Sequence, residues 1–136
     1  MPHQVQDAEL IVTKALPAAA ATANSDPIDL GAQSGHHAFL AECEFEVSIP
    51  ATPDLVEAKT IIVDIQMDTV SNFASPTTLI DNLLTVTGAA AAAGGPAASA
   101  RFRVPTNVER YIRAVATVLD AGGDNTAVSF TLKALF

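Results

Sequence analysis

The residues that could do chemistry in this sequence are few, and their spacing does not suit it. The three histidines are His3, His36 and His37. Adjacent residues of an extended chain point to opposite sides, so His36 and His37 do not converge on a metal ion, and a zinc site needs three or four ligands. Ser34 lies near His36 without the Gly-x-Ser-x-Gly turn that presents a serine nucleophile. We therefore expect no catalytic residue, no metal site and no cofactor, and a protein that is not an enzyme.

The acidic residues offer one other chemistry, which is Ca²⁺ binding by carboxylates. Glu42, Glu44 and Glu46 alternate along one segment, and Asp64 and Asp68 follow in the next. Residues two apart on one strand face lie about 7 Å from each other, so a site would have to bridge strands. A solvated acidic face is the commoner explanation of such a stripe.

Composition excludes further classes of protein. The 136 residues include 7 basic and 15 acidic ones, which gives a formal net charge of −8. Nucleic acid and anionic membranes repel such a chain, and it lacks the cations that displace counterions. Cys43 is the only cysteine, so no internal disulfide forms, and synthesis in a reducing compartment is expected. No signal peptide is evident, and no apolar run approaches the roughly 20 residues of a membrane helix.

Alternation of apolar and polar residues predicts the elements that must position these side chains. It runs through residues 39–49, 60–67 and 101–104, and the β-branched or aromatic runs 111–119 and 126–136 extend it. Phe39, Phe45, Phe102 and Phe130 fall on the expected inward faces. Residues 77–84 are readable as a short helix or as a strand. The sequence therefore predicts an all-β fold, an antiparallel β-sandwich or jelly roll of about seven or eight strands with little helix.

Two segments lie outside this alternation. Residues 1–7 form an expected flexible N-terminal tail, ahead of a single domain at 8–136. Residues 88–100 are rich in Ala and Gly, and we expect a long flexible loop there. Small side chains lose little rotamer entropy when they are laid against a partner, although a tolerated surface insertion explains the loop equally well.

Several motifs occur in a recognisable order. They are Ser-Asp-Pro-Ile-Asp-Leu-Gly at 25–31, Asn-Phe-Ala-Ser-Pro-Thr-Thr-Leu at 72–79, Val-Pro at 104–105 and Glu-Arg-Tyr-Ile-Arg at 109–113. In this order the chain resembles the capsid cement (decoration) proteins of short-tailed bacteriophages. The resemblance implies a jelly-roll virion protein on the capsid exterior, made in the bacterial host cytoplasm. It also implies a homo-oligomer, dimer or trimer, that clamps neighbouring major capsid proteins of an HK97-type shell.

The segments outside the alternation, together with a group of arginines, are the candidate partner contacts. The arginines would pair with an acidic partner surface, or else form an ordinary solvated strand face. The candidates are Met1, Pro2, His3, Gln4, Val5, Ala90, Ala92, Gly94, Gly95, Arg101, Arg103 and Arg113.

Two other functions remain open from the sequence. One is another virion β-sandwich, such as a tail or connector component. The other is a ligand- or sugar-binding jelly-roll module, for which the absence of Trp and the single Tyr111 are unfavourable.

Overall fold

The computed structural model describes residues 10–31, 44–105 and 107–135, which form nine strands and no helix. No helix in this part of the chain is long and apolar enough to cross a membrane. The strands are β1 (Ile11–Ala15), β2 (Thr22–Asn24), β3 (Ile28–Asp29), β4 (Glu44–Ile49), β5 (Thr60–Asp68), β6 (Thr77–Thr87), β7 (Ala98–Arg103), β8 (Tyr111–Val118) and β9 (Ser129–Leu135).

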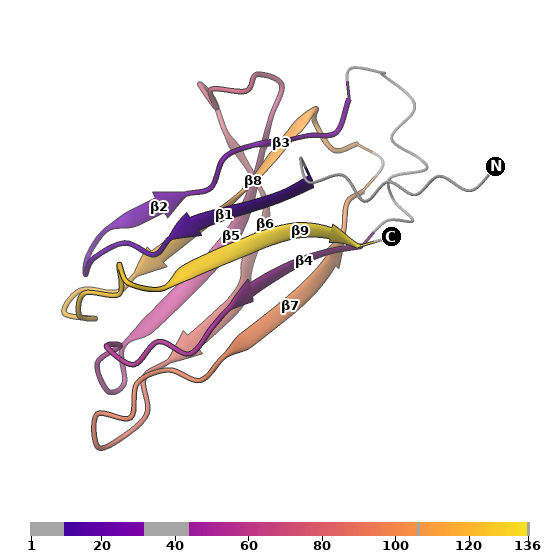
Figure 1. The fold of residues 1–136 in the computed structure, drawn as a ribbon. Helices are drawn as coiled ribbons and strands as arrows, with labels where there is room; N and C mark the ends of the chain where they lie inside the picture. The colour runs from indigo at the N-terminus through magenta and orange to yellow at the C-terminus, as the bar shows by residue number, and fades with distance from the viewer. Residues whose placement is uncertain (1–9, 32–43, 106, 136) are drawn as a thin grey trace.

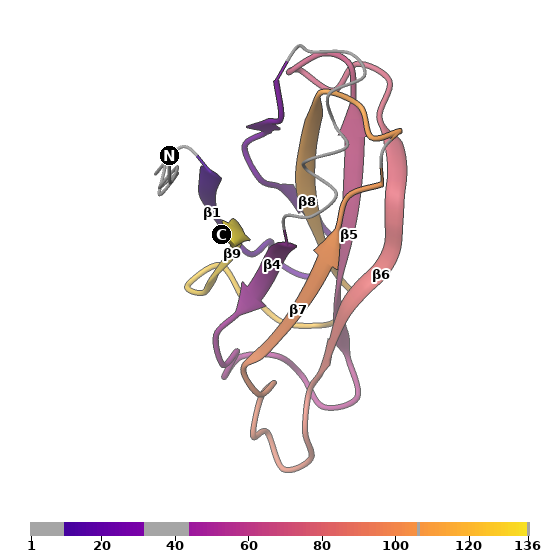
Figure 2. The same cartoon turned by 90° about the vertical axis from the view of Figure 1, so that its right-hand side faces the viewer.

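The strands form two antiparallel sheets that pack face to face (Figures 1 and 2). Sheet A has the order β1-β9-β4-β7, and sheet B has the order β2-β8-β5-β6, with β3 also paired to β8. The expected antiparallel β-sandwich is confirmed. The strand number is nine, above the expected seven or eight, because two short strands, β2 and β3, share the edge of β8.

Alternation places the apolar side chains between the sheets. Phe45, Val47 and Ile49 of β4 are buried, and Phe45 stacks on Phe102 with ring centroids 5.5 Å apart. Phe130 of β9 is fully buried as well. Each such side chain contributes about 1.5–3 kcal/mol by leaving water, so this inner layer is the main source of stability.

Residues 77–84 are strand, and they belong to β6, the longest strand. Its alternation is hidden by a bulge, where the pairing register with β5 shifts between Val63 and Ile65. Asn82 has a φ of 53° at this point, and its backbone N–H donates to Asp64 Oδ1 at 2.7 Å. The bulge bends an edge strand and leaves Asn82 out of the ladder.

Residues 88–97 form a hairpin, and residues 98–100 of the expected loop belong to β7. The N–H of Ala89 donates to the carbonyl of Gly94 at 2.8 Å, which closes a turn at residues 90–93. Thr52 and Gly95 exchange two backbone hydrogen bonds, each 2.9 Å long. Composition alone did not indicate the bonds between Thr52 and Gly95, because these residues lie far apart in the sequence. Figures 1 and 2 show the hairpin projecting beyond the strands.

Candidate functional site

The outer face of sheet A carries a ladder of ion pairs. Glu46 on β4 binds Arg101 on β7 (Nε to Oε2, 3.1 Å) and Lys133 on β9 (Nζ to Oε1, 3.3 Å). Glu44 binds Arg103 (3.4 Å) and Arg101 (3.6 Å). The hydrogen bond from Arg101 lowers the pKa of Glu46, and Lys133 adds to this effect against the cost of burial. The acidic and basic stripes expected from the sequence therefore lie side by side and neutralise each other.

Arg113 lies on β8 in the other sheet, so the three candidate arginines do not form one surface. Its guanidinium donates twice to Gln66 Oε1, at 2.9 and 2.7 Å, and lies 4.2 Å from the centre of the Phe73 ring. Burial lowers the pKa of Arg113, against the attraction of Asp68. Each candidate arginine thus already has a partner within the chain, and contact with a second protein stays a prediction.

Asp68 anchors the loop between β5 and β6. The residue is only 3% exposed, and its carboxylate accepts hydrogen bonds from the N–H groups of Ser75 (2.9 Å) and Val70 (3.1 Å). Burial alone would raise the pKa of this carboxyl, but these bonds outweigh it and the pKa is lowered. The Asp64 carboxylate accepts the hydrogen bond from the backbone N–H of Asn82 in the β6 bulge. Among the described residues no three His, Cys, Asp or Glu side chains group together to hold a metal ion.

Two of the sequence motifs contact each other. Asp29, in the motif at 25–31, accepts two hydrogen bonds of 2.8 Å from Arg110, in the motif at 109–113. Asp29 also accepts the N–H of Gly31 at 2.8 Å, and the Arg110 guanidinium lies 5.0 Å from the centre of the Tyr111 ring. The Arg110 hydrogen bond lowers the pKa of Asp29 despite partial desolvation. The opposite charges were visible in the sequence, but β3–β8 pairing is what brings them together.

Four loops gather at one end of the sandwich, which we call the loop end: residues 16–21, 50–59, 88–97 and 119–128. Backbone bonds join them, from Val56 N–H to the Gly122 carbonyl (3.2 Å) and from Ala58 N–H to the Gly88 carbonyl (3.0 Å). The loop end is therefore built as one hydrogen-bonded surface.

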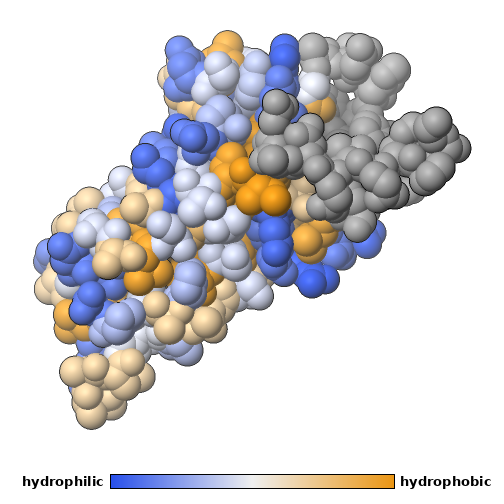
Figure 3. Space-filling model, viewed as in Figure 1, coloured by the Kyte–Doolittle hydropathy of each residue, from blue (hydrophilic) through white to orange (hydrophobic). Residues whose placement is uncertain are grey.

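The hairpin at the loop end has a tip of four exposed alanines, 90–93, which include the candidates Ala90 and Ala92. The hairpin occupies the lower left of Figure 1, and the same region of Figure 3 is pale orange, moderately apolar. The candidates Gly94 and Gly95 are buried at the base of the hairpin. A Cβ at Gly94 would come within 2.5 Å of the Thr52 carbonyl oxygen, so this glycine permits a close backbone approach. Of the four candidates in this segment, Ala90 and Ala92 are therefore open to a partner, whereas Gly94 and Gly95 are not.

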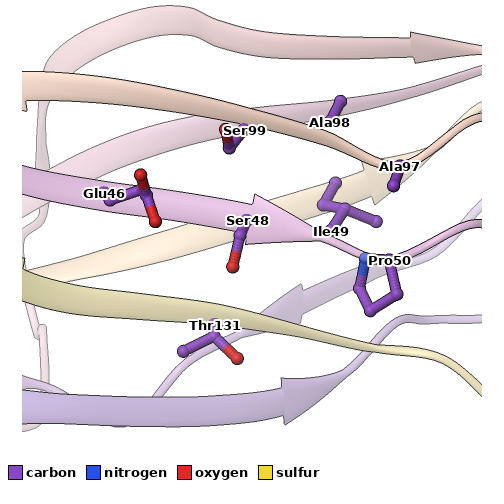
Figure 4. A pocket seen from close by; sticks show the side chains of 8 residues that line it. All are labelled: Glu46, Ser48, Ile49, Pro50, Ala97, Ala98, Ser99 and Thr131. Carbon is purple, nitrogen blue, oxygen red and sulfur yellow. The ribbon is translucent and has the colours of Figure 1, made fainter.

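A shallow depression of about 480 Å³ lies on the outer face of sheet A (Figure 4). Three hydroxyl side chains line it, those of Ser48, Ser99 and Thr131. The other lining residues are Glu46, Ile49, Pro50, Ala97 and Ala98. No aromatic ring is among its eight lining residues. Its one charged group, Glu46, is already bound to Arg101 and Lys133, so the depression offers hydroxyl hydrogen bonding and little else.

Several expectations fall on residues outside the described part of the chain. They are the tail at 1–7 with its candidates Met1, Pro2, His3, Gln4 and Val5, and the side chains of Ser34, His36, His37, Phe39, Glu42 and Cys43.

Comparison with known proteins gives no family. No known family matches the sequence, and no curated protein matches it. Among solved structures, the chain is similar to "Family 16 Carbohydrate Binding Module-2", with 11% identity over 85% of this chain and 69% of that chain, at a TM-score of 0.36. It is also similar to "EclA C-terminal domain; sugar-binding protein", with 14% identity over 97% and 79% of the two chains, at a TM-score of 0.29. Likenesses this low identify neither a family nor a function.

Proposed function

We propose that this protein is a non-catalytic structural protein of a bacteriophage, which binds the outside of an HK97-type capsid and cements neighbouring major capsid proteins. The observation that carries the proposal is the loop end, where hydrogen bonds to Thr52 hold an all-alanine hairpin tip out from the sandwich. The ordered motif resemblance to cement proteins supports the same function.

The alanine tip suits a contact of this kind. Alanine loses almost no side-chain entropy on burial, and the 2.8 Å hydrogen bond from the Ala89 N–H to the Gly94 carbonyl closes the turn within the chain itself. The ordering cost of binding is therefore small. A single tip buries little area, but a homo-oligomer, dimer or trimer, would present several tips, and linked weak contacts add up to firm attachment.

The charge of the chain supports a place on the capsid exterior. A formal net charge of −8 keeps the protein away from packaged DNA, which would trap a basic protein inside the shell. We accordingly propose synthesis in the bacterial cytoplasm, attachment to the outer surface, and no nucleic acid or membrane as partner.

Co-sedimentation with empty shells of the major capsid protein of the same virus tests this function. The double variant Ala91→Asn/Ala92→Asn makes the tip polar and larger, and Asn tolerates the left-handed backbone of both positions. We expect it to bind at least about tenfold more weakly, a change of about 1.4 kcal/mol. The matched control is Ala74→Asn in the exposed loop between β5 and β6, which should bind like the wild type. Equal binding by all three proteins would contradict the proposed role of the tip.

A ligand-binding module is the second candidate, on the observation of the depression in Figure 4. Its hydroxyls could bind a polar ligand, although it lacks the aromatic ring that sugar platforms use. A thermal-shift screen with glycans and divalent cations tests it. A rise in Tm that Thr131→Val abolishes would favour this module over a capsid protein. Rings or tubes in negative-stain images of the purified protein would instead favour a tail or connector component.

A further inference from the structure

The loop end concentrates negative charge that forms no ion pair among the described residues. Its loops carry Asp54, Glu57, Asp120 and Asp124 against the single cation Lys59. Within residues 10–31, 44–105 and 107–135, none of these four carboxylates takes part in an ion pair. This differs from the outer face of sheet A, where Glu44 and Glu46 are matched by cations on both neighbouring strands.

A cleft of about 360 Å³ lies between the hairpin tip and the loop at 50–59. Its apolar lining comes from Pro53, Leu55, Val56 and Ala92, and Val56 is 44% exposed although its side chain is aliphatic. Two carboxylates, those of Asp54 and Glu57, complete the lining, and both residues are exposed.

The walls of this cleft are held by backbone hydrogen bonds. Leu55 N–H donates to the Thr52 carbonyl (3.1 Å), Lys59 N–H to the Val56 carbonyl (3.0 Å), and Val56 N–H to the loop at 119–128 (3.2 Å). Ala92 is placed on the opposite side by the hairpin that Thr52 anchors. The backbone on both sides of the cleft is therefore held in place, and the exposed side chains of Asp54 and Glu57 extend from this backbone.

We propose that the cleft accepts a lysine or arginine side chain from the surface of a partner protein. Such side chains combine an aliphatic stem, which would pack on Val56 and Ala92, with a cationic head, which would pair with Asp54 and Glu57. Like charges would repel an acidic partner from the same cleft. The inference rests on the proposed function, in which the loop end is the contact surface, and it adds the chemistry of the partner: a basic residue beside the site where the alanine tip docks.

A peptide titration tests the cleft without any capsid. The probe is the capped pentapeptide Ala-Ala-Arg-Ala-Ala, added at low salt while the amide resonances of the full chain are followed by NMR. We expect saturable shifts at Val56 and Ala92, which the variant Asp54→Asn/Glu57→Gln abolishes. The control Asp26→Asn/Asp81→Asn removes the same charge from exposed residues outside the loop end and should leave the shifts unchanged. No localised shifts, or equal shifts with a glutamate peptide, would overturn the inference.

Shell binding separates this inference from the proposed function. In the co-sedimentation assay, Asp54→Asn/Glu57→Gln should bind about threefold to tenfold more weakly than the Asp26→Asn/Asp81→Asn control, because exposed ion pairs are individually weak. Equal binding by the two variants would overturn the basic-residue contact and leave the capsid role standing. If the wild type itself does not sediment with shells, the capsid role is wrong, and the peptide titration alone decides the chemistry of the cleft.

Discussion

The substitution Gly95→Ala adds one methyl group at the base of the hairpin and should lower the stability of the protein. A Cβ at this position would lie 2.4 Å from the Thr52 Oγ1, 2.6 Å from the Val86 Cγ1 and 3.0 Å from the Leu55 Cδ2. All three neighbours are buried, so none can move into solvent. In Gly95→Ala, the hairpin strand must therefore move away from the loop at 50–59.

Two contributions determine how much Gly95→Ala lowers the free energy of unfolding. Overpacking of a filled site costs about 1–3 kcal/mol. Moving the hairpin also stretches the two backbone bonds between Thr52 and Gly95, and each such bond contributes about 0.5–1.5 kcal/mol. The two parts describe one displacement and overlap, so we expect the free energy of unfolding to fall by about 2–4 kcal/mol, out of a typical total of about 5–15 kcal/mol.

Urea unfolding followed by circular dichroism measures this change, with an unchanged slope showing that the compactness of both states is preserved. The control is Ala90→Val, which adds two methyl groups to the exposed tip and should change the free energy of unfolding by less than about 0.5 kcal/mol. A loss below about 0.5 kcal/mol in Gly95→Ala would refute the close packing of hairpin and loop described above.

Three further predictions concern the sandwich itself. Acid should destabilise it, because the pKa values of Asp29, Glu46 and Asp68 are lowered in the folded protein. The unfolded carboxyls, with ordinary values of 3.8 for Asp and 4.5 for Glu, bind protons first, so the stabilisation is complete above about pH 5 and is lost progressively as the pH falls below these values. A urea midpoint that does not fall as the pH is lowered through these values would contradict this prediction. Phe130→Ala should lower the free energy of unfolding by about 3–5 kcal/mol, since the ring is fully buried. If urea unfolding shows a loss under about 1 kcal/mol, the result would be inconsistent with that burial. Arg113→Lys should lower the free energy of unfolding by about 1 kcal/mol, because an ammonium group cannot both stack on Phe73 and donate twice in one plane to Gln66. An unchanged urea midpoint would argue against the stacked arrangement.

Local pattern was sufficient to predict most of the strands. Period-two alternation located β4 and β5 and the buried ring of Phe45, since the same residues that alternate in the sequence alternate between core and solvent. It could not assign residues 77–84, because the bulge at Asn82 interrupts the alternation of β6. A bulge is set by the partner strand, here through Asp64, and this partner is not visible in the local sequence.

The candidate site was harder to predict, because its contacts also join residues that lie far apart in the sequence. The sequence separated the glutamates at 42–46 from the arginines at 101–113, but only the pairing of β4 with β7 shows that Glu44 and Glu46 neutralise Arg101 and Arg103. The composition of residues 88–97 predicted a loop, but it could not show that Gly95 bonds to Thr52, which lies 43 residues away in the sequence. The acidic cleft beside the tip joins loops that only the closed sandwich brings together.

The bulge in β6 also affects how readily copies of the protein aggregate through this edge strand. An exposed edge strand of this length is a template on which a second chain can add, and repeated addition gives fibres. The left-handed backbone at Asn82 divides the free edge into the short runs 77–80 and 83–87, and the backbone N–H of Asn82 is already bound to Asp64. Copies of this chain should therefore stay separate at high concentration, because neither short run offers a long continuous edge on which another strand can add.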